Sequence, residues 1–343
     1  MVSDIKFEES NIRRLVYWDI VKGVAILLVI IGHQIQYSCG SYDFIDNPIF
    51  KSIYGFHMAL FMIVSGYFFC FTIKKHTVKK IFVNRSRQCI IPICTFTVLS
   101  EIMLGHFSPY AWIRQSVVSL WFLWAVFFLS LIVLFVNQLP HKFRGYTYLF
   151  LYISFFFFPD WLLSKYIFAM YPCFLIGFLF NEYKVFDRLF SKHLIMITIL
   201  SFILYVVLML FFSKETYIYW SKYSVISGGG YSVLVDVQRT ITGFCGSFFL
   251  LGLLYITYKK SPILITNILT YLGRNTLQLY VISMLPFFIS IEERFSNGEV
   301  SYWLAVVSTL FVTGVSVLLV ELLKRSQLGS FLFFGKAITP KSE

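Results

Sequence analysis

The stretch YWDIVKGVAILLVIIGHQIQYS, residues 17–38, is an apolar run that also carries an aspartate, a lysine and a histidine. It is long enough to cross about 30 Å of hydrocarbon as a single helix. Charged and titratable side chains are costly inside such a helix, so they mark candidate functional positions. We therefore expect a first membrane span here, with Asp19, Lys22 and His33 as candidate site residues on it.

The composition of the whole chain extends this interpretation to the rest of the sequence. Of the 343 residues, 58% are hydrophobic and only 13% are charged. A soluble domain typically carries about 25% charged residues. These values exclude a soluble globular enzyme, a disordered chain and a fibrous repeat, and they predict an all-α, polytopic membrane helix bundle.

Ten apolar stretches of suitable length fill the chain, so we expect one integral-membrane domain over residues 1–343 with about ten transmembrane helices. The expected spans are residues 17–38, 49–72, 89–105, 113–137, 146–162, 165–181, 194–213, 232–257, 276–291 and 302–323. No small-residue cleavage site follows the first run, which is therefore a permanent span and not a signal peptide. With the N-terminus inside, most Lys and Arg residues fall in the inner segments, which predicts that both termini are cytoplasmic.

The net charge of +12 has its origin mainly in these inner segments. We therefore expect membrane lipids as partners and no nucleic acid. The richest segment runs from Lys74 to Arg87 and has two interpretations. It binds lipid headgroups, or it holds an anionic cytosolic ligand through Arg85 and Arg87, which directly precede the third span.

The six cysteines form no CxxC pair and show no spacing with histidine that is typical of zinc ligation. Most of them lie in apolar runs, where cysteine behaves as a small hydrophobic residue. We expect neither a disulfide framework nor a metal site.

Several polar residues are expected at a similar depth in the outer half of the membrane. Lys22 and His33 are eleven residues apart, which is about three helical turns and about 16 Å along one face. His57 lies near the outer start of the second span, Glu101 at the outer end of the third, and Asp236 and Arg239 near the outer start of the eighth, so we expect these four residues at the depth of His33. If they converge, they supply bases, carboxylates and a cation for proton abstraction and charge stabilisation.

Asp236 is also followed three residues later by Arg239, in the spacing of an internal ion pair, and this purely structural interpretation stays open. The same holds for Asp19 and Lys22, three residues apart at the cytoplasmic end of the first span.

These residues also carry a resemblance to a known family. The motif from Asp19 to His33 resembles the first helix of the acyltransferase 3 superfamily, and within it the fucose 4-O-acetylase-like group. Such proteins are integral-membrane O-acyltransferases that act largely on bacterial glycans. Further motifs of this resemblance lie at residues 56–61, 65–69, 121–123, 174–177, 272–277 and 334–336. Tyr280 and Asn275 belong to the motif that begins the penultimate helix.

The resemblance implies transfer of an acyl group, most simply acetyl from acetyl-CoA, to a hydroxyl of a cell-surface glycan or its lipid-linked precursor. It implies a multi-pass protein of a bacterial cytoplasmic membrane with His33 as the catalytic residue. Lys22, Arg85 and Arg87 would hold the phosphates of acyl-CoA while the pantetheine arm reaches His33. His57 and Glu101 would assist His33.

Two positions depart from the family pattern. Gln88 stands where many relatives have a second arginine, three residues after Arg85, and no histidine follows Tyr280. The alternative function is a transporter or flippase for a glycan or lipid, since intramembrane charges suit that class as well. We see no inverted repeat, which many transporters have. The sequence leaves the acceptor and the oligomeric state open.

Overall fold

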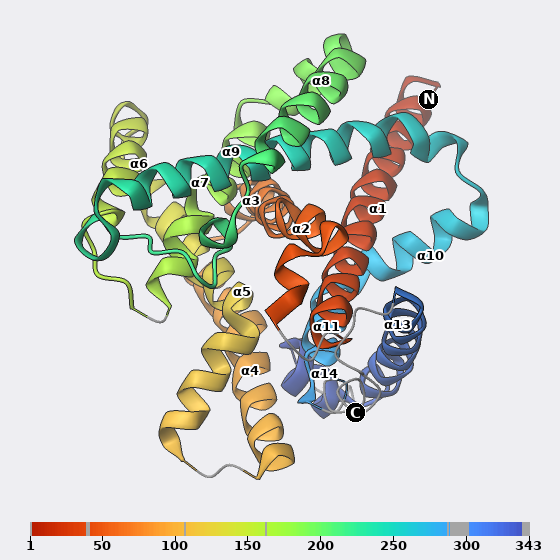
Figure 1. Cartoon of the computed structure of the whole chain (residues 1–343). Helices are drawn as coiled ribbons and strands as arrows, with labels where there is room; N and C mark the ends of the chain where they lie inside the picture. The colour runs from red at the N-terminus through yellow and green to blue at the C-terminus, as the bar shows by residue number, and fades with distance from the viewer. Residues whose placement is uncertain are drawn as a thin grey trace.

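The computed structural model describes residues 2–38, 42–105, 108–161, 163–286, 288 and 302–337, without the side chains of residues 2–15, 38, 42, 43, 187 and 191. All regular elements in these ranges are helical, which confirms the all-α prediction (Figure 1). In chain order they are α1 (Val2–Ser38), η1 (Tyr42–Asp46), α2 (Pro48–Tyr54), α3 (His57–Lys75), α4 (Val78–Leu104), α5 (Pro109–Val136), α6 (His141–Phe155), α7 (Ser164–Glu182), α8 (Val185–Leu210), η2 (Lys214–Thr216), α9 (Val225–Thr257), η3 (Tyr258–Lys260), α10 (Ile263–Arg274), α11 (Thr276–Ser283), α13 (Tyr302–Lys324) and α14 (Gln327–Phe334).

Seven helical segments of the described chain are long and apolar enough to cross a membrane. They are Val16–Tyr37, Pro48–Lys75, Val78–Leu104, Pro109–Val136, Lys192–Leu210, Val225–Lys260 and Tyr302–Lys324. Each of them contains or largely overlaps one of the ten expected spans. The chain is thus a polytopic membrane bundle.

The other three expected spans fall on shorter or less apolar helices. The span at 146–162 lies on α6, which has 15 residues and therefore rises only about 22 Å. The span at 165–181 coincides with α7, whose 19 residues include Lys165 and Glu182. The span at 276–291 begins with α11, which has eight residues, and continues beyond the described residues. The count of ten stays a prediction.

Helices α3 and α7 pack closely against each other, and their contact depends on two glycines. A Cβ at Gly66 would overlap the backbone of Phe174, and a Cβ at Gly177 would overlap the backbone of Ile63. Both glycines belong to motifs of the family resemblance. Small residues let membrane helices approach closely enough for extensive van der Waals contact, which gives these motifs a packing role.

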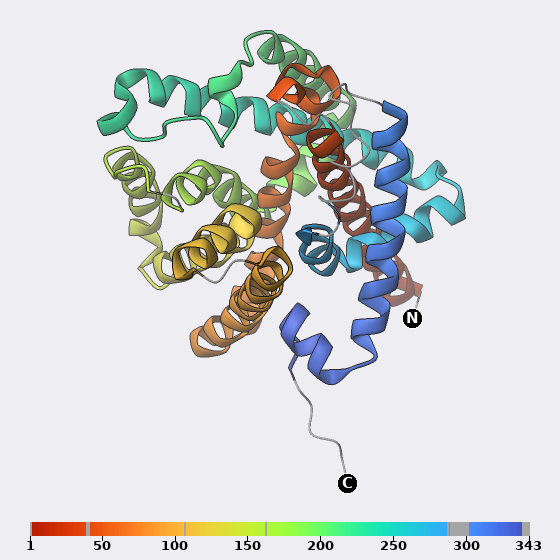
Figure 2. The same cartoon turned by 60° about the horizontal axis from the view of Figure 1, so that its bottom comes forward.

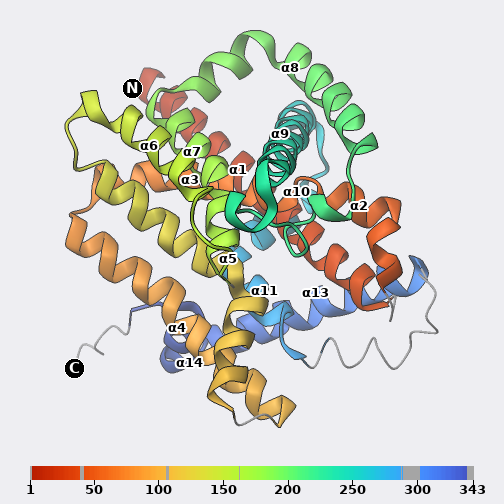
Figure 3. The same ribbon diagram turned by 60° about the vertical axis from the view of Figure 1, so that its left-hand side comes forward.

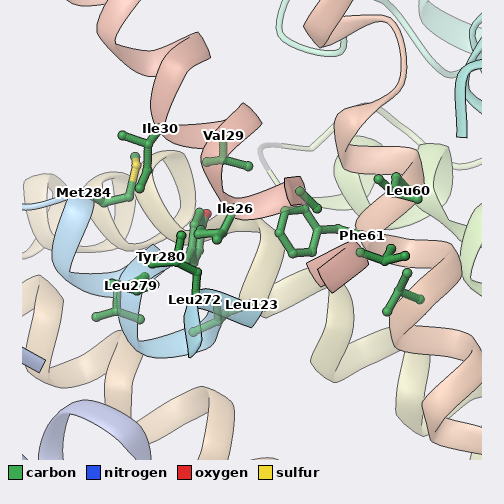
Figure 4. Packing of buried hydrophobic residues seen from close by; sticks show 14 of the residues in the cluster. Ile26, Val29, Ile30, Leu60, Phe61, Leu123, Leu272, Leu279, Tyr280 and Met284 are labelled. Carbon is green, nitrogen blue, oxygen red and sulfur yellow. The ribbon is translucent and has the colours of Figure 1, made fainter. Parts of the chain in front are cut away.

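Helix α1 runs through the middle of the bundle, with α10 and α11 against one side and α13 alongside it (Figure 2). Ile26, Val29 and Ile30 of α1 belong to one buried cluster with Leu279 of α11 and Leu123 of α5 (Figure 4). This cluster fixes α1 against α5 and α11, the helices that also line the candidate site.

Helix α5 is interrupted at Leu120, whose φ of −117° and ψ of 29° are not helical. The hydroxyl of Tyr280 on α11 donates to the carbonyl of Ser119, at 3.1 Å, next to this interruption. A buried carbonyl that a kink leaves without a helical partner needs such a donor. Tyr280 thus ties α11 to the kink and helps to fix the direction of the neighbouring Trp121.

Two regions complete the outline. Helices α4 and α5 form a projecting hairpin, with α14 beside α4 (Figure 3). Helix α8 lies at the periphery of the bundle. Only 11% of its most apolar segment is buried, compared with 61% of the most apolar segment of Pro109–Val136. An apolar helix that the protein itself covers so little is suited to face lipid.

Candidate functional site

A first cavity, of about 280 Å³, lies among α1, α3, α4, α5 and α11. We call it the basic cavity because Lys22 and Arg85 line it, while most of its other lining is apolar, including Phe61, Val64 and Phe122. Two cations beside an apolar passage suit a ligand with an anionic head and a slender uncharged extension.

The two cations of the basic cavity are held against aromatic rings of α3. The Nζ of Lys22 lies 5.3 Å from the ring centroid of Phe68, and the guanidinium of Arg85 lies 4.9 Å from that of Phe69. Cation–π contacts of this kind restrict long side chains without neutralising them. Both side chains are therefore held in place where they line the basic cavity.

Lys22 is also positioned by Asp19, whose carboxylate accepts from Lys22 at 2.7 Å and from Arg274 at 3.0 Å. A Cβ at Gly273 would overlap the backbone of Asp19, so α10 approaches α1 directly at this point. Asp19 does not itself line the basic cavity. Asp19 therefore has a structural role. It joins α1 to α10 and orients Lys22.

Arg85 and Arg87 separate in the structure. Arg85 lines the basic cavity together with Gln88 and Cys89 on the same face of α4. Arg87 is not among the lining residues. Its Nη2 donates to Asn84 at 3.0 Å, and its backbone abuts Gly335 after α14. The position three residues after Arg85 therefore faces the basic cavity, but it offers an amide where many relatives have a cation.

A second and larger cavity, of about 700 Å³, contains both candidate histidines. We call it the histidine cavity. His33 of α1 and His57 of α3 line it, and so do the polar side chains of Gln36, Arg114 and Gln115. Its aromatic lining comes from several elements: Tyr37, Phe44, Phe50, Trp121, Tyr219, Trp220 and Tyr280.

The environment of His33 includes two polar side chains. The Tyr54 hydroxyl donates to Gln36 Oε1 at 3.4 Å and lies 3.5 Å from His33 Nδ1. A phenol and an amide beside the imidazole restrict its orientation.

His57 is positioned by the break between α2 and α3. It is the first residue of α3, and its Nδ1 donates at 2.9 Å to the carbonyl of Ile53. In a continuous helix that carbonyl would accept from the backbone N–H of residue 57 itself. The same carbonyl also accepts from the backbone N–H of Phe56 at 3.2 Å, so the imidazole is a second donor at the break, and its Nε2 is the nitrogen left for other contacts. The Tyr54 ring lies 4.5 Å from that of His57 and 6.4 Å from that of His33, so it adjoins both.

The basic cavity and the histidine cavity meet at two side chains. Met58 of α3 and Tyr280 of α11 line both of them. Lys22 and His33, which sequence spacing places on one face of α1, accordingly line adjoining cavities. Together the two linings offer cations, apolar side chains and two imidazoles.

Asp236 and Arg239 line neither the basic cavity nor the histidine cavity. They form a buried ion pair, and Arg239 also donates to Ser221 at 2.7 Å. Arg239 and His57 both line a third, narrow cavity of about 40 Å³. The internal ion pair left open by the sequence is therefore present, on the far side of His57.

The two remaining candidates also lie outside the cavities. Glu101 is buried near the end of α4 and lines neither the basic nor the histidine cavity. Asn275 joins α10 to α11 and donates to the carbonyl of Tyr271 at 2.8 Å, while its neighbour Thr276 lines the basic cavity. Of the five groups expected to converge, His33 and His57 line the histidine cavity, and Glu101, Asp236 and Arg239 do not.

Within the described ranges, no three His, Cys, Asp or Glu side chains are grouped closely enough to hold a metal ion. The cysteines described there, Cys70, Cys89, Cys94, Cys173 and Cys245, are all free thiols. Cys39 lies outside the described residues.

Sequence reasoning missed three polar residues beside the histidines: Tyr54, Gln36 and Arg114. One signal was available, because Gln36 follows His33 by three residues and therefore shares its helix face. Tyr54 and Arg114 come from α2 and α5. Nothing in the local sequence connects those helices to α1.

The chain is thus an α-helical membrane bundle with a basic cavity and an adjoining cavity that two histidines line. Residues 15–321 match the family model described as an acyltransferase domain. The chain therefore belongs to the acyltransferase 3 family, and family membership implies an acyl donor and an acceptor.

Two curated proteins are similar to part of the chain. The nodulation protein NolL of Sinorhizobium fredii (strain NBRC 101917 / NGR234) is 36% identical over 124 residues, which is 33% of this chain and 34% of that protein. NolL of Mesorhizobium japonicum (strain LMG 29417 / CECT 9101 / MAFF 303099) is 34% identical over 121 residues, 32% of each chain. The chain thus matches about a third of the length of these relatives. No solved structure is significantly similar to it.

Proposed function

We propose that this protein is a membrane O-acyltransferase. It moves an acetyl group from cytosolic acetyl-CoA to a hydroxyl of a cell-surface glycan or its lipid-linked precursor. It works as one integral-membrane domain of about ten spans in a bacterial cytoplasmic membrane, with both termini in the cytoplasm. The observation that carries the proposal is the junction of the basic cavity with the histidine cavity at Met58 and Tyr280.

The basic cavity suits the donor. Lys22 and Arg85 offer two cations to the phosphates of CoA, and Gln88 adds a neutral hydrogen-bonding group beside them. The apolar middle of the passage fits the uncharged pantetheine arm and excludes the nucleotide. This division keeps the phosphates near water while the thioester extends toward His33.

The histidine cavity suits the transfer step. His33 Nε2 removes the proton of the acceptor hydroxyl as its oxygen attacks the thioester carbonyl. The carbon–sulfur bond then breaks, the acetyl ester is left on the acceptor, and the CoA thiolate takes the proton from His33. Tyr54 and Gln36 lie beside the His33 ring and restrict its orientation. His57, whose ring adjoins the same Tyr54, stabilises the charge that develops during transfer.

The alternative order of events forms an acyl-imidazole on His33 before the acceptor reacts. It differs from direct transfer in one observable way. Label from acetyl-CoA would stay on the protein when acceptor is withheld, and it would be chased to the acceptor when that is added.

The test is acyl transfer by the purified protein in nanodiscs, with labelled acetyl-CoA and a panel of glycan and lipid-linked acceptors. Label should reach an acceptor with the wild type and be lost with His33→Ala, while a folded variant such as Lys222→Gln retains transfer. Lys222 is exposed and lines neither the basic cavity nor the histidine cavity. Folded wild type that neither binds nor turns over acetyl-CoA would refute the proposal and favour glycan or lipid transport.

A further inference from the structure

Among the described residues that line the histidine cavity, one side chain is formally charged, apart from the histidines. It is Arg114 of α5, and no Asp or Glu is among those residues. Arg114 also takes part in none of the ion pairs formed within the described ranges. A cation that faces a cavity without a protein carboxylate is available to a ligand anion.

Arg114 belongs to the acceptor side of the site. The donor phosphates have their own cations, Lys22 and Arg85, in the basic cavity, and Arg114 is absent from that lining. The basic cavity reaches the histidine cavity through Met58 and Tyr280, with an apolar lining between. A CoA molecule whose phosphates contact Lys22 would therefore not present a second anion to Arg114.

The remainder of the lining suits a sugar. Trp121 and Trp220 provide aromatic surfaces on which pyranose rings stack, and Gln115 beside Arg114 supplies both a donor and an acceptor. The indole N–H of Trp121 donates to the hydroxyl of Tyr219 at 3.2 Å, which holds the orientation of that ring. A planar guanidinium beside such surfaces matches an oxyanion bidentately.

We propose that the acceptor is an acidic glycan, whose carboxylate or phosphate pairs with Arg114 while its hydroxyl meets His33. This inference rests on the proposed function and narrows its acceptor class. Because Arg114 is exposed, the gain should be near the lower end for charge-assisted hydrogen bonds, which corresponds to about a tenfold preference for the acidic acceptor.

The experiment compares the wild type with Arg114→Gln and Lys222→Gln in nanodiscs of phosphatidylcholine. The acceptors are a neutral hexose oligosaccharide, a uronic-acid analogue of the same length, and a polyprenyl-phosphate-linked sugar. The wild type should favour at least one anionic acceptor about tenfold in kcat/KM, and the preferred one tells carboxylate from phosphate. Arg114→Gln should reduce this ratio to near one, and the Lys222→Gln control should keep it. Equal loss with all acceptors, or an unchanged ratio, overturns the inference.

A binding measurement separates this inference from the proposed function. Acceptor binding is measured without acetyl-CoA, from the quenching of tryptophan fluorescence. If no label reaches any acceptor, the proposed function fails, yet tighter binding of the anionic glycan that depends on Arg114 would still support the anion site. A repeat with added phosphatidylglycerol addresses the other source of anions. An effect of Arg114→Gln that follows lipid charge and not acceptor charge would show a headgroup contact and overturn the inference.

Discussion

The separation of Arg85 from Arg87 gives the sharpest test of the basic cavity. The two arginines lie two residues apart on α4, and either one changed to glutamine loses the same charge. Only Arg85 lines the basic cavity. Arg87 donates to Asn84 instead. Comparing the two variants therefore tests the position of the arginine on α4, while the chemical change is the same in both.

The size of the expected effect follows from the contact that Arg85 would make. A hydrogen bond to a charged group contributes about 1.5–3 kcal/mol, which corresponds to about a tenfold to hundredfold rise in KM for acetyl-CoA on Arg85→Gln. The lost contact with Phe69 costs about 0.5–1 kcal/mol of folding stability. Arg87→Gln removes only a local hydrogen bond and should change KM by no more than about twofold.

The assay is CoA release under steady-state conditions in nanodiscs, at saturating acceptor, with thermal unfolding of each variant as a control. The KM effect should be lost at high salt, since ionic contacts with phosphate are screened. An Arg87→Gln variant that raises KM as much as Arg85→Gln would refute the assignment of the donor to the basic cavity.

Three further predictions concern the scaffold of the site. Asp236→Asn leaves Arg239 buried without its ionic partner and should cost about 3–5 kcal/mol of stability, measured by thermal unfolding; a stable variant with lost transfer would instead give Asp236 a direct role. Tyr280→Phe leaves the Ser119 carbonyl beside the α5 kink without its donor and should cost about 1–3 kcal/mol, with a raised KM; unchanged stability and KM would contradict this positioning role. Gly177→Ala forces α3 and α7 apart and should cost about 1–3 kcal/mol or more, seen as a lower melting temperature in detergent, whereas an unaltered melting temperature would argue against the close approach.

Much of the fold could be predicted because membrane spans are a local property of the sequence. An apolar run of about twenty residues must form a helix in lipid, since every backbone polar group needs a partner inside the segment. Seven of the ten expected runs meet that condition in the described chain. The others fall on α6, α7 and α11, where length or polarity departs from it, and no local rule decides whether neighbouring helices compensate.

The candidate site was predictable only along single helices. Helical periodicity alone relates Lys22 to His33, because eleven residues complete about three turns. The pairing of Asp236 with Arg239 was equally local. Neither Arg85 nor Arg87 could be preferred from sequence, because both lie in the same basic run.

What the sequence by itself determined is the class of protein, the helix that carries His33, and the family motifs. Only the tertiary structure decided that His33 and His57 share a cavity, that Arg85 lines the basic cavity, and that Glu101 and Asp236 lie elsewhere. The physical reason is that a helix fixes the relative positions of its own side chains. Which faces of different helices meet depends on close contacts such as those at Gly66 and Gly177, made between residues far apart in the chain.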